Sequence, residues 1–304
     1  MLVWAVASQK GGVGKTTTVA SLAGWLQKEG LRVLVIDTDP HASLTSYLGF
    51  DDDAPEYNLF DLYAAPEVTR ELFLKTVTAT RHQGLDILPS SMTLATIDRQ
   101  LSGRQGVGRI LAKSLDRVRD CYDAVLIDCP PVLGALMVNA LVAATTILVP
   151  TQTEFLALKG LQGMVRTFDI MSHAQNGTAF DYVVVPTMFD RRTRASNQSL
   201  EFMREHYKSV WSGCIPIDTK FRESSSRRLP LPLMDAHCRG SEAYRELLCY
   251  LISHELSRNS QQVTPALAAI LADDGESDAP LTHHGEEVVA EAVAAMIAPK
   301  ESAS

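Results

Sequence analysis

Residues 8–18 read Ser-Gln-Lys-Gly-Gly-Val-Gly-Lys-Thr-Thr-Thr. An apolar run at residues 2–7 precedes this stretch, and an amphipathic run at residues 19–28 follows it. A strand, a glycine-rich loop and a helix in this order form the arrangement that a phosphate-binding loop requires. The sequence therefore predicts a nucleotide site at the turn between a strand over 2–7 and a helix over 15–28.

The loop carries the groups that bind phosphate. Its glycines free the backbone N–H groups to surround phosphate oxygens, and the following helix adds partial positive charge. Lys15 is expected to reach the β- and γ-phosphates, and the Thr16 hydroxyl to ligate Mg²⁺. A glycine turn without a ligand is the alternative, but two lysines this close repel each other unless an anion lies between them. The loop residues predicted to bind ATP are Lys10, Gly11, Gly12, Val13, Gly14, Lys15, Thr16 and Thr17.

The loop departs from the ordinary pattern at two positions, because Gln9 replaces the usual glycine and Lys10 is an additional lysine. Lys10 is badly placed for its own nucleotide and well placed for one bound by a second copy. The loop resembles the deviant Walker A motif of the ParA/MinD family of ATPases. That resemblance implies an ATP-dependent homodimer in which Lys10 contacts the partner's phosphates. Lys10 and Lys15 are therefore predicted catalytic residues; a cation supplied in trans contributes roughly 10³–10⁵ in rate in related enzymes.

Two acidic motifs follow predicted buried strands. The run 32–36 leads into Asp37-Thr-Asp39-Pro, and the run 124–127 leads into Asp128-Cys-Pro-Pro. Such acids lie at the carboxyl edge of a sheet, where open α/β folds bind ligands. Each aspartate alone is equally typical of a strand-end turn; the glycine-rich loop upstream favours a magnesium site.

The family resemblance implies a role for each of these acids. Asp39 would position the attacking water, which makes it the third predicted catalytic residue. Asp37 would support the Mg²⁺ shell and Asp128 would hold Mg²⁺ through water, so the predicted metal residues are Thr16, Asp37, Asp39 and Asp128. Asp39 is a weak base, and catalysis must therefore depend on positioning and charge stabilisation. We expect slow, partner-stimulated hydrolysis, which is typical of a switch.

The pattern of elements predicts an α/β fold. Predicted strands and helices alternate through the first 250 residues, which is typical of a mostly parallel, twisted sheet between two helical layers: a three-layer P-loop NTPase. The predicted strands are 2–7, 32–36, 85–88, 123–127, 145–149, 181–186 and 210–214. The predicted helices are 15–28, 42–48, 104–119, 134–143, 157–173, 197–208 and 240–254. The segment 51–75 is expected to be a surface excursion with one short helix.

The chain has 304 residues and a formal net charge of −8, most of it near the C-terminus. We expect an ATPase domain over 1–256 and an acidic tail over 257–304, disordered apart from short helical segments. Four apolar residues of the tail share one helical face. An idle solvated tail and a partner-docking helix both remain open. These four residues are Val263, Leu267, Ile270 and Leu271.

The region 189–228 is locally basic. Within it, the segment 188–193 (Met-Phe-Asp-Arg-Arg-Thr) resembles a family segment that carries a DNA-binding basic residue. This implies non-specific DNA binding through phosphate contacts, with a solvated basic face as the alternative. The predicted DNA-binding residues are Arg192, Lys220, Arg222, Arg227 and Arg228. The same resemblance adds Met188, Pro216 and Asp218 to the predicted ATP-binding residues.

Composition also bears on location. The five cysteines are scattered, which argues for a reducing compartment and against structural zinc. The most apolar stretch, 132–150, is interrupted by polar residues and fits a helix followed by a strand. MinD-like proteins end in a basic amphipathic helix that binds anionic lipid, whereas this tail is acidic. We expect a cytoplasmic protein, at the cell pole or on the nucleoid, without stable membrane insertion.

Three segments indicate a subgroup of the family: 39–47, 150–160 and 188–193. Together they resemble the ParA-like ATPases encoded with chemotaxis genes, of the ParC type, and the resemblance covers residues 1–254. It implies an ATP-dependent switch that positions chemotaxis signalling arrays at the cell pole through a protein adaptor. DNA segregation is the first alternative, and a nucleotide-dependent scaffold with negligible hydrolysis is the second.

Overall fold

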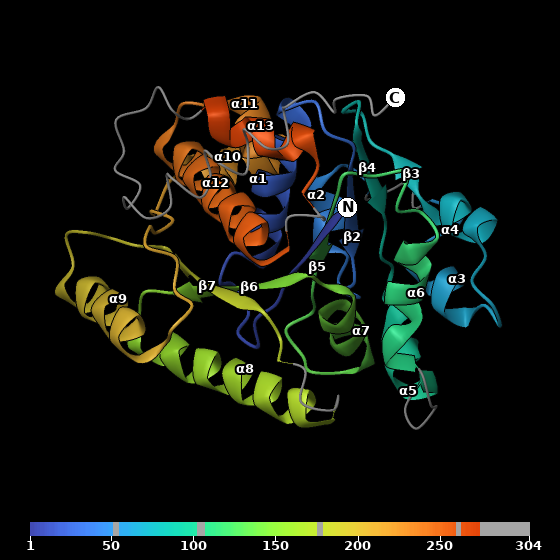
Figure 1. Ribbon diagram of the computed structural model, residues 1–304, viewed down its shortest axis with the longest axis horizontal. Helices are drawn as coiled ribbons and strands as arrows, with labels where there is room; N and C mark the ends of the chain where they lie inside the picture. Colours follow the sequence, from blue (N-terminus) through green and yellow to red (C-terminus); the bar gives the residue numbers. More distant parts are fainter. Residues whose placement is uncertain (51–54, 102–106, 175–178, 260–262, 274–304) are drawn as a thin grey trace, which may run out of the picture.

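The computed structural model describes residues 1–50, 55–101, 107–174, 179–259 and 263–273. Within this part of the chain, seven strands form one sheet in the order β3-β4-β2-β5-β1-β6-β7 (Figure 1). All neighbouring strands are parallel except the short β3, which pairs antiparallel with β4. The strands are β1 (Leu2–Val6), β2 (Val33–Asp37), β3 (Thr78–Ala79), β4 (Leu85–Leu88), β5 (Ala124–Asp128), β6 (Thr146–Gln152) and β7 (Tyr182–Thr187).

Helices cover both faces of the sheet, as Figure 1 shows, and the predicted three-layer α/β architecture is confirmed. One face packs against α1, α2, α12 and α13, and the other against α3 to α9. The helices are α1 (Lys15–Lys28), α2 (Ser43–Tyr47), α3 (Leu59–Ala64), α4 (Arg70–Thr76), α5 (Ile97–Leu101), α6 (Ile110–Asp116), α7 (Ala135–Ala143), α8 (Phe155–Ala174), α9 (Arg194–His206), α10 (Lys220–Ser226), α11 (Leu231–Met234), α12 (Arg239–Asn259) and α13 (Pro265–Asp273). Two 3₁₀ turns, Met92–Thr96 and Val107–Arg109, precede α5 and α6.

The apolar strand sequences follow from this layering. In β1, Leu2, Trp4 and Val6 face one helical layer, whereas Val3 and Ala5 face the other. Because both faces are buried, alternation with polar residues is lost and the strand reads as one apolar run. The central strands end at the edge of the sheet that carries the glycine-rich loop.

One predicted strand is wrong. Residues 210–214 make a single bridge, Val210 to Val184, and then leave the sheet. The chain folds over the Trp211 ring at Gly213, where an added Cβ would lie only 2.4 Å from that ring. A glycine next to a bulky aromatic therefore redirects the segment before a ladder forms.

Several short elements were not predicted. The segment 51–75 holds two helices, α3 and α4, within its described part, and α3 begins with a capping box between Asn58 and Asp61. The predicted helix over 104–119 is reduced to a 3₁₀ turn and α6, and residues 102–106 lie outside the described part. Helices α10 and α11 are too short to show a helical period in the sequence.

The expected boundary at residue 256 falls inside α12, which continues to Asn259. Helix α13 packs on α12 and buries Leu267 and Ile270 in the core, together with Val263 just before the helix. The shared helical face of these residues is therefore a packing surface. Residues 274–304 of the expected acidic tail lie outside the described part. Among the described helices, none is long and apolar enough to cross a bilayer.

A buried carboxylate ties the last long helix to the sheet. Glu255 on α12 is 1% exposed, and its Oε1 accepts hydrogen bonds from Trp4 Nε1 (2.9 Å), Thr145 Oγ1 (2.8 Å) and Thr146 Oγ1 (2.8 Å). These donors belong to β1 and to the start of β6. One oxygen therefore meets three donors at this junction, and it is the acceptor for the buried indole N–H of Trp4.

Removing this acceptor should destabilise the fold. Glu255→Ala removes the acceptor of the buried Trp4 Nε1, whereas the Thr145 and Thr146 hydroxyls keep the Val3 carbonyl oxygen and Asp181 as acceptors. We expect the free energy of unfolding to fall by about 1–3 kcal/mol. Glu255→Gln keeps an oxygen acceptor and should lose less. Urea unfolding followed by circular dichroism measures both, with the exposed Glu201→Ala as a control. Equal losses for the Ala and Gln variants would contradict this account of Oε1.

Candidate functional site

The glycine-rich loop joins β1 to α1 at the carboxyl edge of the sheet. Gly12 and Gly14 have φ angles of +74° and +95°, which only glycine adopts without strain. No atom lies within 4 Å of the position that a Cβ would take at Gly11, Gly12 or Gly14. The space beside these three glycines is therefore open, which leaves room for a phosphate to approach the loop.

Lys15 and Thr16 begin α1 beneath this cradle. The Lys15 ammonium donates to the Lys10 carbonyl oxygen at 3.4 Å, and Thr16 Oγ1 donates to Asp128 Oδ2 at 2.6 Å. Asp128 is 1% exposed, and its other oxygen, Oδ1, has no hydrogen-bond partner among the described residues. A buried carboxylate oxygen without a partner is costly unless a cation or a water satisfies it. The donor set of Thr16 and Asp128 therefore fits Mg²⁺.

Asp37 lies opposite Asp128 in the pairing of β2 with β5. Its carboxylate accepts from Thr45 N and Thr45 Oγ1, both at 2.8 Å, and from Asp39 N at 3.1 Å. Burial raises the pKa of Asp37 to about 6. Burial, together with the charge of Asp37, also raises the pKa of Asp128 well above its usual value. Two buried carboxylates on adjacent strands make this edge a site that favours a cation.

Asp39 extends from the loop after β2, and its Oδ1 accepts from the His41 backbone N–H at 3.0 Å. The ring nitrogen Nδ1 of His41 lies 3.0 Å from the same oxygen. In the described part of the chain, no group of three or more His, Cys, Asp and Glu side chains is arranged to hold a metal. Thr16 and Asp128 are thus in contact, whereas Asp37 is turned to Thr45 and Asp39 to His41.

The additional lysine of the loop has partners that sequence reasoning missed. The Lys10 ammonium forms an ion pair with Glu154 and donates to Gln152 Oε1 at 2.7 Å. Gln152 Nε2 in turn donates to the Gly12 carbonyl oxygen at 3.1 Å. A carboxylate of the same chain therefore lies beside the second lysine. Gln152 ends β6 and Glu154 follows it at the sheet edge, so the edge rule that selected Asp37 and Asp128 applies to them too.

Gln9 turns away from the cradle toward α8. Its Nε2 donates to Thr167 Oγ1 at 3.2 Å, and its Oε1 lies where a Cβ on Gly163 would be only 2.8 Å away. A glycine at position 163 thus makes room for the side chain at position 9. The amide anchors the leading edge of the loop to α8, which explains why glycine is absent from this position.

The other predicted ATP-binding residues come from the loops after β7. Gln152 Nε2 also lies 2.8 Å from Met188 Sδ, which brings Met188 to the cradle edge. Pro216 pairs with Phe189 in an isolated bridge. Asp218 accepts from the backbone N–H groups of Lys220 (2.9 Å) and Gly240 (3.1 Å), so both its oxygens are occupied near the start of α12.

The predicted DNA-binding residues are spread along two loops and α10. Asp190 holds the Arg192 guanidinium through two hydrogen bonds (2.9 and 2.8 Å), and Asp235 pairs with Lys220 at 3.1 Å. Arg222 is exposed on α10. Arg227 and Arg228 are exposed at the other end of α10, where the Arg81 guanidinium donates to their carbonyl oxygens. The structure therefore separates Arg192 from Arg227 and Arg228.

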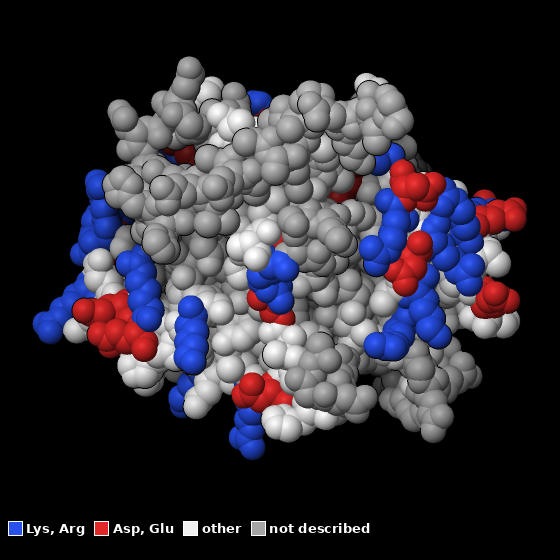
Figure 2. Space-filling model, in the orientation of Figure 1, with Lys and Arg blue, Asp and Glu red and all other residues white. Residues whose placement is uncertain are grey.

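Figure 2 shows Lys and Arg on both flanks of one face, interspersed with Asp and Glu. The flank over α4 and α6 is neutralised by three ion pairs. These are Arg70–Asp120, Arg117–Glu67 and Arg119–Asp116. A basic surface for a polyanion has to be sought elsewhere on the molecule.

Comparison with known proteins agrees with this geometry. A family model described as an AAA domain matches residues 1–187. The chain is 36% identical over 262 residues to the chromosome partitioning protein ParA of Caulobacter vibrioides, covering 85% of this chain and 97% of the relative. It is 34% identical over 244 residues to the sporulation initiation inhibitor protein Soj of Bacillus subtilis, covering 80% and 95%.

Among solved structures, cobyrinic acid a,c-diamide synthase from Mycobacterium smegmatis, with a bound ATP analogue and magnesium, superimposes with a TM-score of 0.70. It is 31% identical, and the match covers 86% of this chain and 98% of that one. With the glycine-rich loop, its two lysines and the paired strand-end aspartates on one edge of a parallel sheet, the chain belongs to the ParA/MinD family of ATPases.

Proposed function

We propose that this chain is a ParA-type ATPase switch that binds ATP and Mg²⁺, closes into a homodimer and positions a cellular cargo. One observation carries the nucleotide part. The open glycine cradle stands directly above Thr16, which bonds Asp128, and the second oxygen of that buried carboxylate has no partner among the described residues. Cradle and cation site are thus adjacent, as nucleotide phosphates and their metal require.

Each residue of the site then has a role. The backbone N–H groups of residues 11–17 and the Lys15 ammonium bind the phosphates. Thr16 and Asp128 hold Mg²⁺, which neutralises phosphate charge when bound, and the remaining ligands are phosphate and water oxygens. Asp37 supports Asp128 from the neighbouring strand. Asp39 positions the attacking water. Met188, Pro216 and Asp218 bind ATP on the side of the site that receives the nucleotide base.

Asp39→Ala should block hydrolysis while ATP binding and dimer closure persist. We expect hydrolysis to fall on the order of 100-fold, because the group that orients the water is lost. Size-exclusion chromatography with ATP and Mg²⁺ should then give a stable dimer. The double variant Lys10→Ala/Asp39→Ala should remain monomeric. A monomeric Asp39→Ala protein in ATP would show that the proposed cycle is wrong.

Lys10 has to break its contacts within its own chain before it can reach a partner's nucleotide. In the single chain its ammonium is neutralised by Glu154 and bonded to Gln152. Its side chain is 30% exposed, so exchange of the carboxylate for a phosphate of a second copy requires no unfolding. We propose that Glu154 restrains Lys10 in the monomer and thereby disfavours closure before a nucleotide is bound.

Glu154→Gln should therefore favour dimerisation. An exposed ion pair contributes at most about 1 kcal/mol and each of the two protomers breaks one, so the dimer dissociation constant in ATP should fall by up to about 30-fold. Analytical ultracentrifugation of the Asp39→Ala background measures this without turnover. Glu201→Gln on α9 is the matched control and should change nothing. Weaker dimerisation of Glu154→Gln would mean that Glu154 assists closure instead.

We propose chemotaxis signalling arrays as the cargo, reached through a protein adaptor at the cell pole. Support comes from segments 39–47, 150–160 and 188–193, which resemble the chemotaxis-associated subgroup. Hydrolysis in this proposal is slow and partner-stimulated, and the dimer also binds DNA non-specifically. Segregation of DNA is the second candidate, favoured by the similarity to the ParA and Soj proteins. A scaffold with negligible hydrolysis is the third.

Localisation in cells separates these candidates. A fluorescent fusion should coincide with a chemoreceptor marker at the pole, and deletion of the gene should disperse that marker. Array positions that are unchanged while chromosome or plasmid copies are lost would favour segregation. Phosphate release by purified protein, with and without DNA, tests the scaffold: an undetectable rate under both conditions would exclude the switch.

A further inference from the structure

Two consecutive carbonyl oxygens of the glycine-rich loop are bonded by side chains that lie far away in the sequence. Gln152 Nε2 donates to the Gly12 carbonyl oxygen at 3.1 Å. Thr187 Oγ1 donates to the Val13 carbonyl oxygen at 2.9 Å. The loop is therefore held by groups outside it at two neighbouring peptide units.

The two donors are themselves neighbours in the sheet. Gln152 ends β6, Thr187 ends β7, and the parallel pairing of these strands places the two residues opposite each other. Neighbouring positions on two strands thus match neighbouring carbonyls of the loop. Because strand register fixes the spacing of the donors, the contact depends on the rigid part of the fold.

The orientation of the Gln152 amide is determined by its partners. Its Oε1 accepts from the Lys10 ammonium at 2.7 Å, and its Nε2 contacts both the Gly12 carbonyl oxygen and Met188 Sδ. An ammonium requires an oxygen and a carbonyl requires an N–H, so the amide can satisfy both in one orientation only. A carboxylate at this position could hold Lys10 but would have no N–H for Gly12.

The hydrogen bond of Thr187 is buried. Its side chain belongs to a residue that is 2% exposed, and the acceptor residue, Val13, is 1% exposed. Water does not compete for a hydroxyl and a carbonyl at such a place, so the bond between them is maintained. The Val13 carbonyl therefore has a fixed direction.

Fixing these carbonyls also directs the N–H groups of the loop. In a trans peptide unit the N–H points away from the C=O of the preceding residue. Since the carbonyls of Gly12 and Val13 are turned to the strand ends, the N–H groups of Val13 and Gly14 are turned away from them. Gly12 has a φ of +74°, and a glycine loop without such anchors would lose more entropy when it orders around a phosphate.

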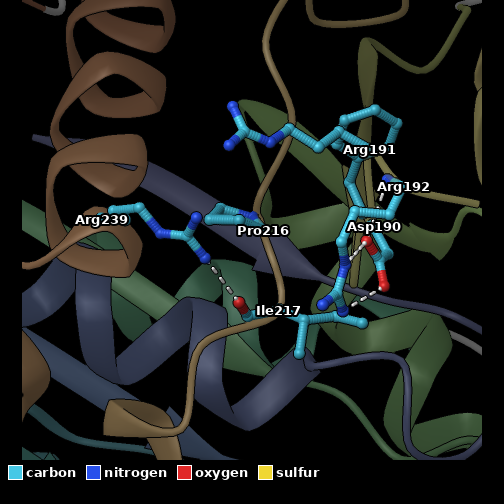
Figure 3. A pocket seen from close by; sticks show the side chains of 7 residues that line it. Asp190, Arg191, Arg192, Pro216, Ile217 and Arg239 are labelled. Atoms are coloured by element: carbon cyan, nitrogen blue, oxygen red, sulfur yellow. Dashed lines mark hydrogen bonds and ion pairs between the residues drawn. The ribbon is translucent and has the colours of Figure 1, made fainter.

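The strand end that carries Thr187 is held in turn. The Thr187 carbonyl oxygen accepts from Thr153 N at 3.1 Å. Figure 3 shows the loop that follows, in which the Arg192 guanidinium bonds both oxygens of Asp190. The hydroxyl of Thr187 thus projects from ordered backbone, which a positioning group requires.

We propose that Gln152 and Thr187 are positioning residues of the phosphate loop. They hold its carbonyls so that the N–H groups of Val13 and Gly14 face the phosphates of the nucleotide. This rests on the proposed function, in which the loop binds ATP, and it assigns part of that affinity to two side chains outside the loop.

Removing either donor should weaken nucleotide binding. Thr187→Val keeps the shape of the side chain without its hydroxyl, and Gln152→Met keeps the length without the amide. For each variant we expect the Kd for ADP with Mg²⁺ to rise about 5-fold, the effect of one lost hydrogen bond. Thr187→Ser restores the hydroxyl and should recover most of the affinity.

Isothermal titration calorimetry of the full chain with ADP and Mg²⁺ measures the Kd and the binding-competent fraction separately. A positioning role raises the Kd at unchanged stoichiometry, whereas a general loss of structure lowers the stoichiometry. Thr151→Val is the matched control, because Thr151 is also 2% exposed and lies next to Gln152. Its hydroxyl donates to the Val149 carbonyl oxygen of its own strand at 3.2 Å, so its Kd should equal that of the parent.

Three results would overturn the proposal. Parent-like Kd values for both Thr187→Val and Gln152→Met would show that the anchors do not position the loop, although the nucleotide site stands. A Thr187→Ser variant as weak as Thr187→Val would show that the hydroxyl is not the group that matters. If the parent itself does not bind ADP, the proposed function fails, and this role fails with it.

Discussion

The buried carboxylate of Asp128 is the constraint on which the rest of this site depends. It ends the central strand β5, bonds Thr16 at the start of α1 and stands opposite Asp37 at the end of β2. One group thus connects the phosphate loop to two strands. Its burial and the nearby charge of Asp37 raise its pKa, and a cation beside the two carboxylates would offset this electrostatic cost. The fold is arranged to hold negative groups together until a ligand neutralises them.

The leading edge of the loop, at Gln9 and Lys10, likewise holds charged groups close together, here with positive charge. Two lysines lie within six residues of the loop, and Glu154, just after β6, forms an ion pair with Lys10. Gln9 anchors this leading edge through a hydrogen bond to Thr167 on α8. The leading edge of the loop is therefore held by residues at the end of β6 and by the helix that follows it.

Much of this architecture was predictable from the sequence. Strands β1, β2, β4 and β5 and helix α1 were found nearly residue by residue, because their apolar runs and flanking glycine or aspartate residues are local signals. The strand expected at 210–214 was wrong, because the contact between Gly213 and the Trp211 ring depends on how the segment packs. Helices α10 and α11 were not predicted, since segments of seven and four residues are too short to show a helical period. Gln152 and Glu154 were missed as partners because they lie far from Lys10 in the sequence.

The sequence by itself determined the chemistry: a glycine-rich loop with two lysines, and acids at the ends of buried strands. Their identity follows from local pattern, since a strand, a tight turn and a helix form wherever those residues occur in that order. Tertiary structure alone decided which charges are available. It pairs Lys10 with Glu154 and Lys220 with Asp235, and it leaves one oxygen of Asp128 without a partner among the described residues. Such pairings depend on distances across the fold, to which residues far apart in the chain contribute, and no local pattern encodes them.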